Sequence, residues 1–168
     1  MELLEKLTNT ETVKTWKYFD WLEVEIAKEK MIISRTGFTN ELGWEIYFRP
    51  ENNSEKVGDL ILNEGKKLGM ILVATPGFRC RRIEAGLLSA GQDFSKYTNP
   101  FSVGLGKFID FDKENFIGTN ALSKADKTCF SWGIRVEDGI AIKGEIVNSN
   151  GKEAGKITSS TWSPYQVC

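Results

Sequence analysis

Glu45 and Tyr47 are the side chains whose types and spacing best suit ligand binding. They stand two positions apart in "GWEIYFR", and a period of two places both on one face of a predicted strand. A carboxylate offers two acceptor oxygens on one rigid group, and tyrosine adds an aromatic face and a hydroxyl. On periodicity alone, a solvated glutamate on the polar face of a half-buried strand is the simpler interpretation. The opposite face of this strand is apolar: Trp44, Ile46 and Phe48.

Other chemistry is restricted by what the sequence lacks. The chain has no histidine, which excludes Ser–His and Cys–His nucleophile pairs and histidine-bound metals. Neither a CxxC pair nor a phosphate-binding GxxxxGK[ST] loop is present. Three aspartates lack the spacing of a calcium loop and are expected to be solvated turn residues: Asp93, Asp110 and Asp112. We therefore predict neither a metal site nor a disulfide framework from the three cysteines: Cys80, Cys129 and Cys168.

Length and charge favour an ordinary globular protein. The chain has 168 residues, 40% of them hydrophobic, and a formal net charge of −1. Acidic and basic residues are interspersed, so we expect no nucleic-acid partner. No apolar run approaches the ~20 residues that cross a bilayer, and the first residues do not resemble a secretory signal. We predict a soluble, cytoplasmic chain that does not bind membranes and whose partner is a small molecule or a protein.

The first third of the sequence predicts a helix followed by antiparallel strands. Residues 2–7 have the pattern of an amphipathic helix. Two β-prone runs, 16–27 and 30–34, are separated by the charged turn "KEK" and predict a hairpin. The strand that carries Glu45 follows after a glycine-containing loop.

Two further helices are predicted next. Residues 54–69 have Ser54 as candidate N-cap and Gly69 near the end. The apolar face of this helix is expected to contain Val57, Leu60, Ile61 and Leu68. Residues 71–88 predict a short apolar strand and then a helix that Pro76 begins and Gly86 ends.

The amino-acid composition changes after residue 88. Residues 89–118 are rich in Gly, Asp and Asn, which predicts a long ordered connection around short strands. A short helix is expected within 118–126. Segments 130–139 and 144–160 alternate in strand fashion, with turn signals at Asp138–Gly139 and Asn150–Gly151.

Three sequence blocks and their order along the chain are characteristic: "SRTGFTNELGWEIYF", then "RRIEAGLLSAGQDFSKYTNPFSVGLGKFIDFDKENFIGTNAL", then "GKITSSTWSP". Together they resemble the aminomethyltransferase family, which includes the glycine-cleavage T-proteins. The second and third blocks are most similar to the dimethylsulfoniopropionate demethylase branch. The resemblance covers nearly the whole chain.

The resemblance implies an α+β fold. A ferredoxin-like α/β sheet portion of the T-protein middle domain would occupy residues 1–125, with its connecting segment. An incomplete antiparallel β-barrel domain would begin at residue 126 and run to residue 168. Family members are about twice as long, so we expect a partial chain. T-proteins carry their catalytic aspartate in the half that is not matched, and no residue of this chain is assigned a catalytic role.

The resemblance also implies a tetrahydrofolate site. The family's pterin-binding glutamate falls on Glu45, and Tyr47 and Phe38 are expected to line the site, although ordinary packing explains both equally well. One departure stands out, because Phe78 and Arg79 occupy the positions where T-proteins have an arginine and an aspartate. Either Arg79 substitutes for that arginine or the site differs. Loss of the arginine fits the demethylase-like branch better than a glycine-cleavage enzyme.

Two other groups have competing interpretations. An aromatic cluster could form the wall of a site for a cationic sulfonium, or simply be core: Trp16, Tyr18, Phe19 and Trp21. Arg82 and Glu84 are expected to make structural ion pairs.

Two hypotheses follow for function. The first is a fragment of a tetrahydrofolate-dependent aminomethyltransferase or methyltransferase, which moves a one-carbon unit from a small-molecule donor to folate. The second is a non-catalytic folate-binding or assembly module that forms a homo-oligomer, or joins a partner chain, through an exposed half-domain surface.

Overall fold

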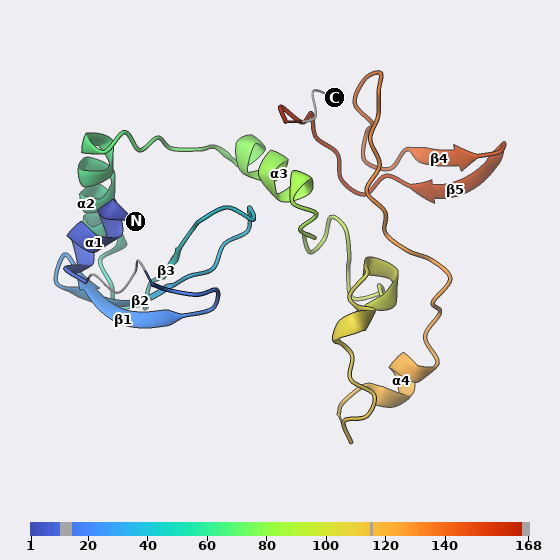
Figure 1. Cartoon of the computed structure of the whole chain (residues 1–168), viewed down its shortest axis with the longest axis horizontal. Coiled ribbons are helices and arrows are strands. Elements are labelled where there is room, and N and C mark those ends of the chain that lie inside the picture. The colour runs from blue at the N-terminus through green and yellow to red at the C-terminus, as the bar shows by residue number, and fades with distance from the viewer. Residues whose placement is uncertain (11–14, 115, 166–168) are drawn as a thin grey trace. The chain divides into compact units, whose positions relative to one another are not determined.

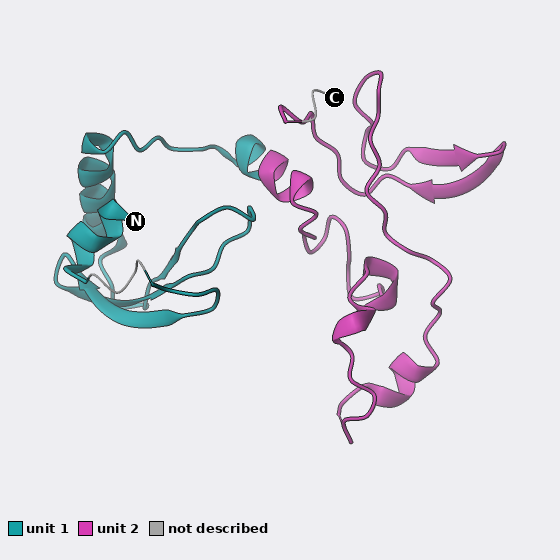
Figure 2. Ribbon diagram, viewed as in Figure 1, with its two compact units in different colours: residues 1–78 teal, residues 79–168 magenta. Residues whose placement is uncertain are grey.

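The computed structural model describes residues 1–10, 15–114 and 116–165 and divides the chain into two compact units. Unit 1 comprises residues 1–78 and unit 2 begins at residue 79 (Figure 2). Helices and antiparallel ladders occur in separate segments of the chain (Figure 1). The structure therefore confirms the α+β class.

Unit 1 contains a three-stranded antiparallel sheet in the order β1–β2–β3. The strands are β1 (Trp21–Ile26), β2 (Glu29–Ser34) and β3 (Glu45–Tyr47). The predicted hairpin is confirmed, although its first strand begins at Trp21 and not at Trp16. Ala27 and Lys28 form the two-residue turn with φ of 55° and 67°, the left-handed conformation that matches the twist of the flanking strands.

The core of unit 1 lies between one face of this sheet and two helices, α1 (Glu2–Thr8) and α2 (Ser54–Lys67). The strands contribute alternate residues, as their period of two requires. The buried apolar side chains are Leu4, Val24, Ile26, Met31, Ile33 and Val57. Trp44 and Ile46 pack against this cluster as predicted. Phe48 does not, because β3 ends at Tyr47 and the Phe48 side chain is exposed.

Helix α2 is capped at both ends, but not entirely as predicted. Its N-cap is Asn53, whose side-chain oxygen accepts a hydrogen bond from the Lys56 N–H at 3.0 Å; Ser54 is the first helical residue. At the other end Gly69, with φ of 78°, allows a Schellman turn in which the Met70 N–H bonds to the Gly65 carbonyl at 2.9 Å. The predicted core residue Leu68 lies at this turn and is exposed.

Residues 71–73 were expected to form an apolar strand, and this prediction is wrong. They belong to no strand, and the side chains of Ile71 and Leu72 are exposed. The helix that follows, α3 (Thr75–Glu84), is confirmed. Its last residue is Glu84, and Gly86, with φ of 69°, follows in a second Schellman turn in which the Leu87 N–H bonds to the Arg82 carbonyl.

Unit 2 consists mainly of irregular chain around short elements. These are η2 (Phe101–Val103), η3 (Gly106–Phe108), α4 (Thr119–Ser123), β4 (Ile146–Ser149) and β5 (Lys152–Lys156). The predicted turn at Asn150–Gly151 joins β4 to β5 in an antiparallel ladder. Residues 130–139 were expected to be a strand, but they form none. Within the described part of unit 2, the ladder has two strands and closes no barrel.

A buried ion pair joins separate segments of unit 2. Arg82, at the end of α3, lies 2.6 Å from a carboxylate oxygen of Asp93, and their side chains are only 4% and 6% exposed. The same guanidinium donates to the Leu87 carbonyl at 3.0 Å and to Ser159 Oγ at 2.9 Å. Arg82 was expected to make a structural ion pair, and it does. Asp93 was expected to be solvated, and that prediction is wrong because the turn folds it onto α3.

Asp93 accepts hydrogen bonds on both of its oxygens. Ser89 N–H donates to Oδ2 at 2.8 Å, and Thr158 Oγ donates to Oδ1 at 2.8 Å. Burial alone raises the pKa of Asp93, but hydrogen bonds from Ser159, Ser89, Thr158 and Arg82 outweigh it and hold the pKa below its ordinary value. Glu84 adds a second connection, since it pairs with Arg81 at 2.6 Å and accepts from Ser163 Oγ.

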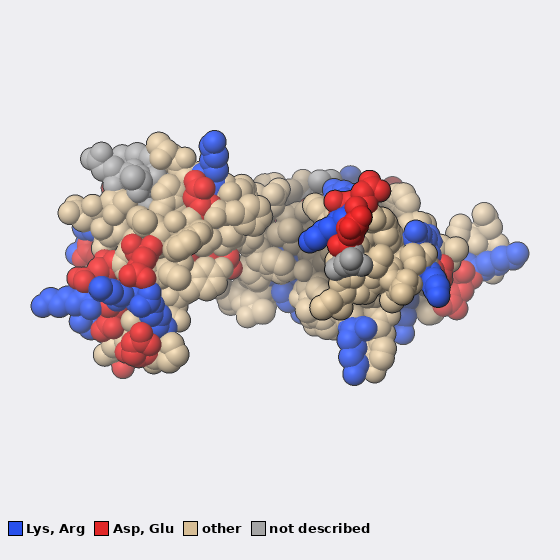
Figure 3. Space-filling view, turned by 90° about the horizontal axis from the view of Figure 1, so that it is seen from below, with Lys and Arg blue, Asp and Glu red and all other residues tan. Residues whose placement is uncertain are grey.

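The surface shows no concentration of one charge on the face in view, where acidic and basic side chains are interspersed (Figure 3). Of the helices described, none combines the length and apolar character needed to span a bilayer.

An ion-pair cluster joins the two helices of unit 1. Glu64 of α2 lies 2.5 Å from Lys6 of α1 and 2.6 Å from Lys67. Hydrogen bonds from these two ammonium groups outweigh partial burial and lower the pKa of Glu64 to about 2, from an ordinary value of 4.5.

We expect Glu64→Gln to destabilise the chain at neutral pH, because glutamine carries no charge to pair with the two lysines. Since the folded-state pKa is depressed, the carboxylate's contribution is complete above 4.5 and disappears as the pH falls toward 2. Urea unfolding of both proteins across this range measures the difference, with Glu51→Gln, an exposed loop carboxylate, as control. A stability gap that stayed constant down to the acid end would contradict the prediction.

We expect Asp93→Asn to lower the free energy of unfolding of unit 2 by about 3 kcal/mol, because it leaves the Arg82 charge buried without its partner. Asp110→Asn is the matched control: Asp110 is exposed and accepts the Asp112 N–H at 3.0 Å, a bond that asparagine retains. Hydrogen exchange at the amides of unit 2, recorded as the temperature rises, measures the stability of unit 2 in both variants. Equal stability of the two variants would refute the importance of the pair.

Candidate functional site

The open face of the three-stranded sheet carries the predicted ligand-binding residues. Trp21, Ser34 and Glu45 are directly paired across β1, β2 and β3 and form one row. Glu23, Ile32 and Tyr47 form the next row. Because paired residues in a sheet point to the same side, all six lie opposite the buried core face.

Hydroxyl groups hold the Glu45 carboxylate on this face. Tyr47 donates its hydroxyl to Glu45 Oε2 at 3.0 Å, and Thr36 Oγ donates to the same oxygen. Ser34 Oγ lies 3.0 Å from Thr36 Oγ. Since Thr36 has only one hydroxyl hydrogen and gives it to Glu45, Ser34 must be the donor in this second bond. The side chains thus form a chain of hydrogen bonds that ends on one oxygen of the carboxylate.

The other carboxylate oxygen of Glu45 remains open to a ligand. Among the described residues, Oε1 accepts no hydrogen bond, and the Glu45 side chain is exposed. A carboxylate fixed at one oxygen and open at the other can accept hydrogen bonds from a planar group that carries adjacent N–H donors. The arrangement can therefore bind and orient a ligand.

Arg35 fixes the loop that supplies Thr36. Its guanidinium lies 4.7 Å from the Tyr18 ring centroid and 5.3 Å from that of Trp44. It also donates to the Gly43 carbonyl at 3.0 Å, which closes the loop between β2 and β3. Sequence reasoning missed Arg35 and Thr36, although the polar run "SRT" directly before the loop was a signal, since three polar residues there need partners.

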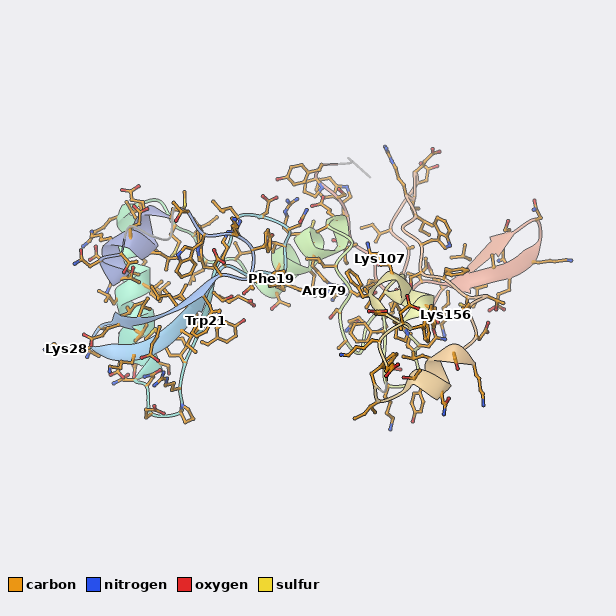
Figure 4. The ribbon with its side chains drawn as sticks, turned by 60° about the horizontal axis from the view of Figure 1, so that its bottom comes forward. Phe19, Trp21, Lys28, Arg79, Lys107 and Lys156 are labelled. Atoms are coloured by element: carbon orange, nitrogen blue, oxygen red, sulfur yellow. The ribbon has the colours of Figure 1, made fainter. Side chains whose placement is uncertain are left out.

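Phe38 lies in the same loop but not against Glu45 in any described contact. Its ring stacks on Phe78, with centroids 5.9 Å apart and planes inclined by 27°. Phe78 is one of the two residues at which we expected a departure from the T-protein pattern. The following residue, Arg79, is exposed and belongs to unit 2 (Figure 4).

The aromatic cluster at the start of β1 is not simply core. Phe19 and Trp21 are 77% and 66% exposed. With three neighbours they line an open-sided cavity of about 440 Å³, whose other lining residues are Trp16, Asp20 and Leu22.

The described residues contain no group of three His, Cys, Asp or Glu side chains placed to hold a metal ion. Cys80 and Cys129 are free thiols, and Cys168 lies outside the described residues.

Comparison with known proteins supports the family resemblance. The family described as the GCVT N-terminal domain matches residues 1–113. An aminomethyltransferase of Halothermothrix orenii is 32% identical over 97% of this chain and 46% of its own length. An aminomethyltransferase of Lysinibacillus sphaericus is 36% identical over 97% of this chain and 45% of its own length. One of Aquifex aeolicus is 43% identical over 81% of this chain and 37% of its own length.

The chain spans less than half the length of these relatives. The match nevertheless includes the loop and strand that carry Thr36, Glu45 and Tyr47. It also extends through α3 to the turn of Asp93. On this evidence of sequence and of matched length, the chain belongs to the aminomethyltransferase family.

Proposed function

We propose that this chain is part of a tetrahydrofolate-dependent one-carbon transferase and that Glu45 binds the pterin ring of the folate. The supporting observation is the Glu45 carboxylate itself, which two hydroxyls orient on an open sheet face in a member of the aminomethyltransferase family. A pterin edge presents adjacent N–H donors, and a carboxylate accepts charge-assisted hydrogen bonds from them. The role of Glu45 is binding and orientation, and we assign no catalytic residue to this chain.

Tyr47 and Phe38 have supporting roles in this proposal. Tyr47 orients Glu45 through its hydroxyl and leaves its half-exposed ring available to a planar ligand. Phe38, stacked on Phe78, supplies an apolar wall of the loop. A one-carbon donor of small size would complete the reaction, with folate as acceptor.

We further propose the domain assignment and the donor class. Residues 1–125 would form the ferredoxin-like portion of the folate-binding domain, and residues 126–168 the start of an antiparallel barrel. Phe78 and Arg79, in place of the arginine and aspartate of T-proteins, favour a donor of the sulfonium demethylase-like branch over the glycine-cleavage donor. Removal of a positive side chain at Phe78 is consistent with a donor that is itself a cation.

The sharpest test is calorimetric titration of the chain with tetrahydrofolate. Glu45→Ala should weaken binding roughly 10- to 100-fold, the cost of losing hydrogen bonds to a charged group. Tyr47→Phe, which keeps the ring and loses the hydroxyl, should have a smaller effect in the same direction. Glu51→Ala, an exposed carboxylate just beyond β3, is the control. Wild-type affinity in a folded Glu45→Ala variant would exclude this site.

A second candidate function, assembly with another copy of the chain, is favoured by one observation. Exposed apolar side chains occur at alternate positions in two parts of a segment that forms no strand, 130–134 and 140–142: Phe130, Trp132, Ile134, Ile140 and Ile142. Such a pattern would be buried if the segment paired with further strands.

We expect light scattering to show concentration-dependent self-association of the chain that Trp132→Ser weakens, because the substitution removes the largest exposed apolar side chain of this segment. Lys124→Ser, a substitution of a polar residue after α4, should leave association unchanged. A wild-type chain that remained monomeric at high concentration would rule this candidate out.

A further inference from the structure

Arg49 brings a positive charge to the open sheet face that carries Glu45 and Tyr47. Its guanidinium pairs with the carboxylate of Glu23, and Glu23 lies on this face because it shares a row with Tyr47. Arg49 stands two residues beyond the end of β3, so its side chain reaches back over the sheet to β1. The proposed folate site has not yet given this ion pair a role.

A turn fixes the backbone of Arg49. The Arg49 N–H donates to Asn52 Oδ1 at 2.8 Å, and the Asn52 N–H donates to the Arg49 carbonyl at 3.0 Å. The Asn52 side chain also donates to the carboxylate of Glu29, the first residue of β2, at 3.3 Å. The backbone of Arg49 is therefore tied to the same sheet that positions Glu45.

The ion pair leaves most of the guanidinium available to a ligand. A guanidinium carries five N–H donors, and among the described residues that of Arg49 donates to Glu23 Oε2 alone. The side chains of Arg49 and Glu23 are 39% and 49% exposed. Exposed pairs of this kind contribute little to stability, so a second carboxylate can join or replace Glu23 at small cost. The planar fork of a guanidinium suits a carboxylate in a bidentate geometry.

Three different chemistries thus follow one another at every second residue. Glu45 offers an acceptor oxygen, Tyr47 a half-exposed aromatic ring and Arg49 a cation. An extended chain advances about 3.3 Å per residue, so their backbone positions are spread over about 13 Å or less. Folates present complementary groups in the same order, namely N–H donors on the pterin edge, an aromatic benzoyl ring and the carboxylates of a glutamate tail.

We propose that Arg49 binds a tail carboxylate of the folate whose pterin edge Glu45 holds, and that it thereby selects glutamylated folates over pterins without a tail. The inference rests on the proposed function of Glu45. Arg49 is a specificity-determining residue, because a tailless pterin still contacts Glu45 and Tyr47 but has no group for the guanidinium. Glu23 competes for the same guanidinium and limits the affinity gained from the tail.

Calorimetric titration of the full chain with two ligands tests this selectivity. One ligand is tetrahydrofolate, and the other is a tetrahydropterin that carries a methyl group in place of the benzoyl-glutamate tail. Arg49→Gln should weaken tetrahydrofolate binding about 10-fold, the cost of losing a hydrogen-bonded contact to a charged group. It should leave methyltetrahydropterin binding unchanged, which also shows that the variant is folded.

Further variants separate the contact from the charge. Arg49→Lys keeps the charge but loses the planar fork, so its tetrahydrofolate affinity should lie between those of wild type and Arg49→Gln. Glu23→Gln should strengthen tetrahydrofolate binding about twofold, because it removes the competing carboxylate. Lys28→Gln is the matched control, since Lys28 is an exposed cation at the hairpin turn, at the other end of β1 from Trp21 (Figure 4).

The outcomes distinguish this inference from the proposed function. Unchanged tetrahydrofolate affinity in Arg49→Gln, or an equal loss in Lys28→Gln, would refute the role of Arg49 while the Glu45 site stands. A wild-type chain that bound methyltetrahydropterin as tightly as tetrahydrofolate would gain nothing from the tail and would refute it too. Wild-type affinity for both ligands in Glu45→Ala would instead overturn the proposed function, and the tail contact with it.

Discussion

One-sided burial of the three-stranded sheet is the constraint on which the candidate site depends. Helices α1 and α2 cover the face formed by Val24, Ile26, Met31 and Ile33. The period of two then fixes every other side chain on the open face, including Trp21, Glu45 and Tyr47. A slip of one residue in register would place the carboxylate in the core. Burial of the core face therefore fixes the position of the proposed ligand-binding residues.

Unit 2 is organised by polar contacts instead. All fully apolar side chains that are buried in the described chain belong to unit 1, whereas the buried residues of unit 2 are Arg82 and Ser163. Arg82, Asp93, Thr158 and Ser159 connect three segments far apart in the sequence. A buried ion pair requires specific partners, so this network defines the arrangement of the segments more than it adds stability.

The network joins side chains from two of the sequence blocks that carry the family resemblance. Arg82 and Glu84 lie in "RRIEAG", Asp93 in "GQD", and Ser159 and Ser163 in "TSSTWS". These blocks carried much of the family resemblance, yet their polar side chains bind one another. The proposed folate site lies instead in the loop and strand of residues 34–47, where hydroxyls are arranged around Glu45.

The sequence by itself determined the elements with strong local signals. The hairpin, helices α1 to α3 and the Asn150–Gly151 turn follow from apolar periodicity and from residues that tolerate positive φ. It also placed Glu45 opposite the core, because a strand's alternation is a local property. Local patterns failed for Ile71 and Leu72 and for residues 130–139, where a strand requires a partner that the sequence does not specify.

Only the tertiary structure decided which distant side chains meet. Asp93 looks like a turn residue in sequence, but the fold buries it on Arg82. Thr36 and Ser34 reach Glu45 only because β2 and β3 pair in one register. Phe19, in the left-handed region, donates its N–H to the Arg35 carbonyl, a contact between residues far apart in the sequence. Contacts of this kind depend on chain closure over many residues, which no local pattern encodes.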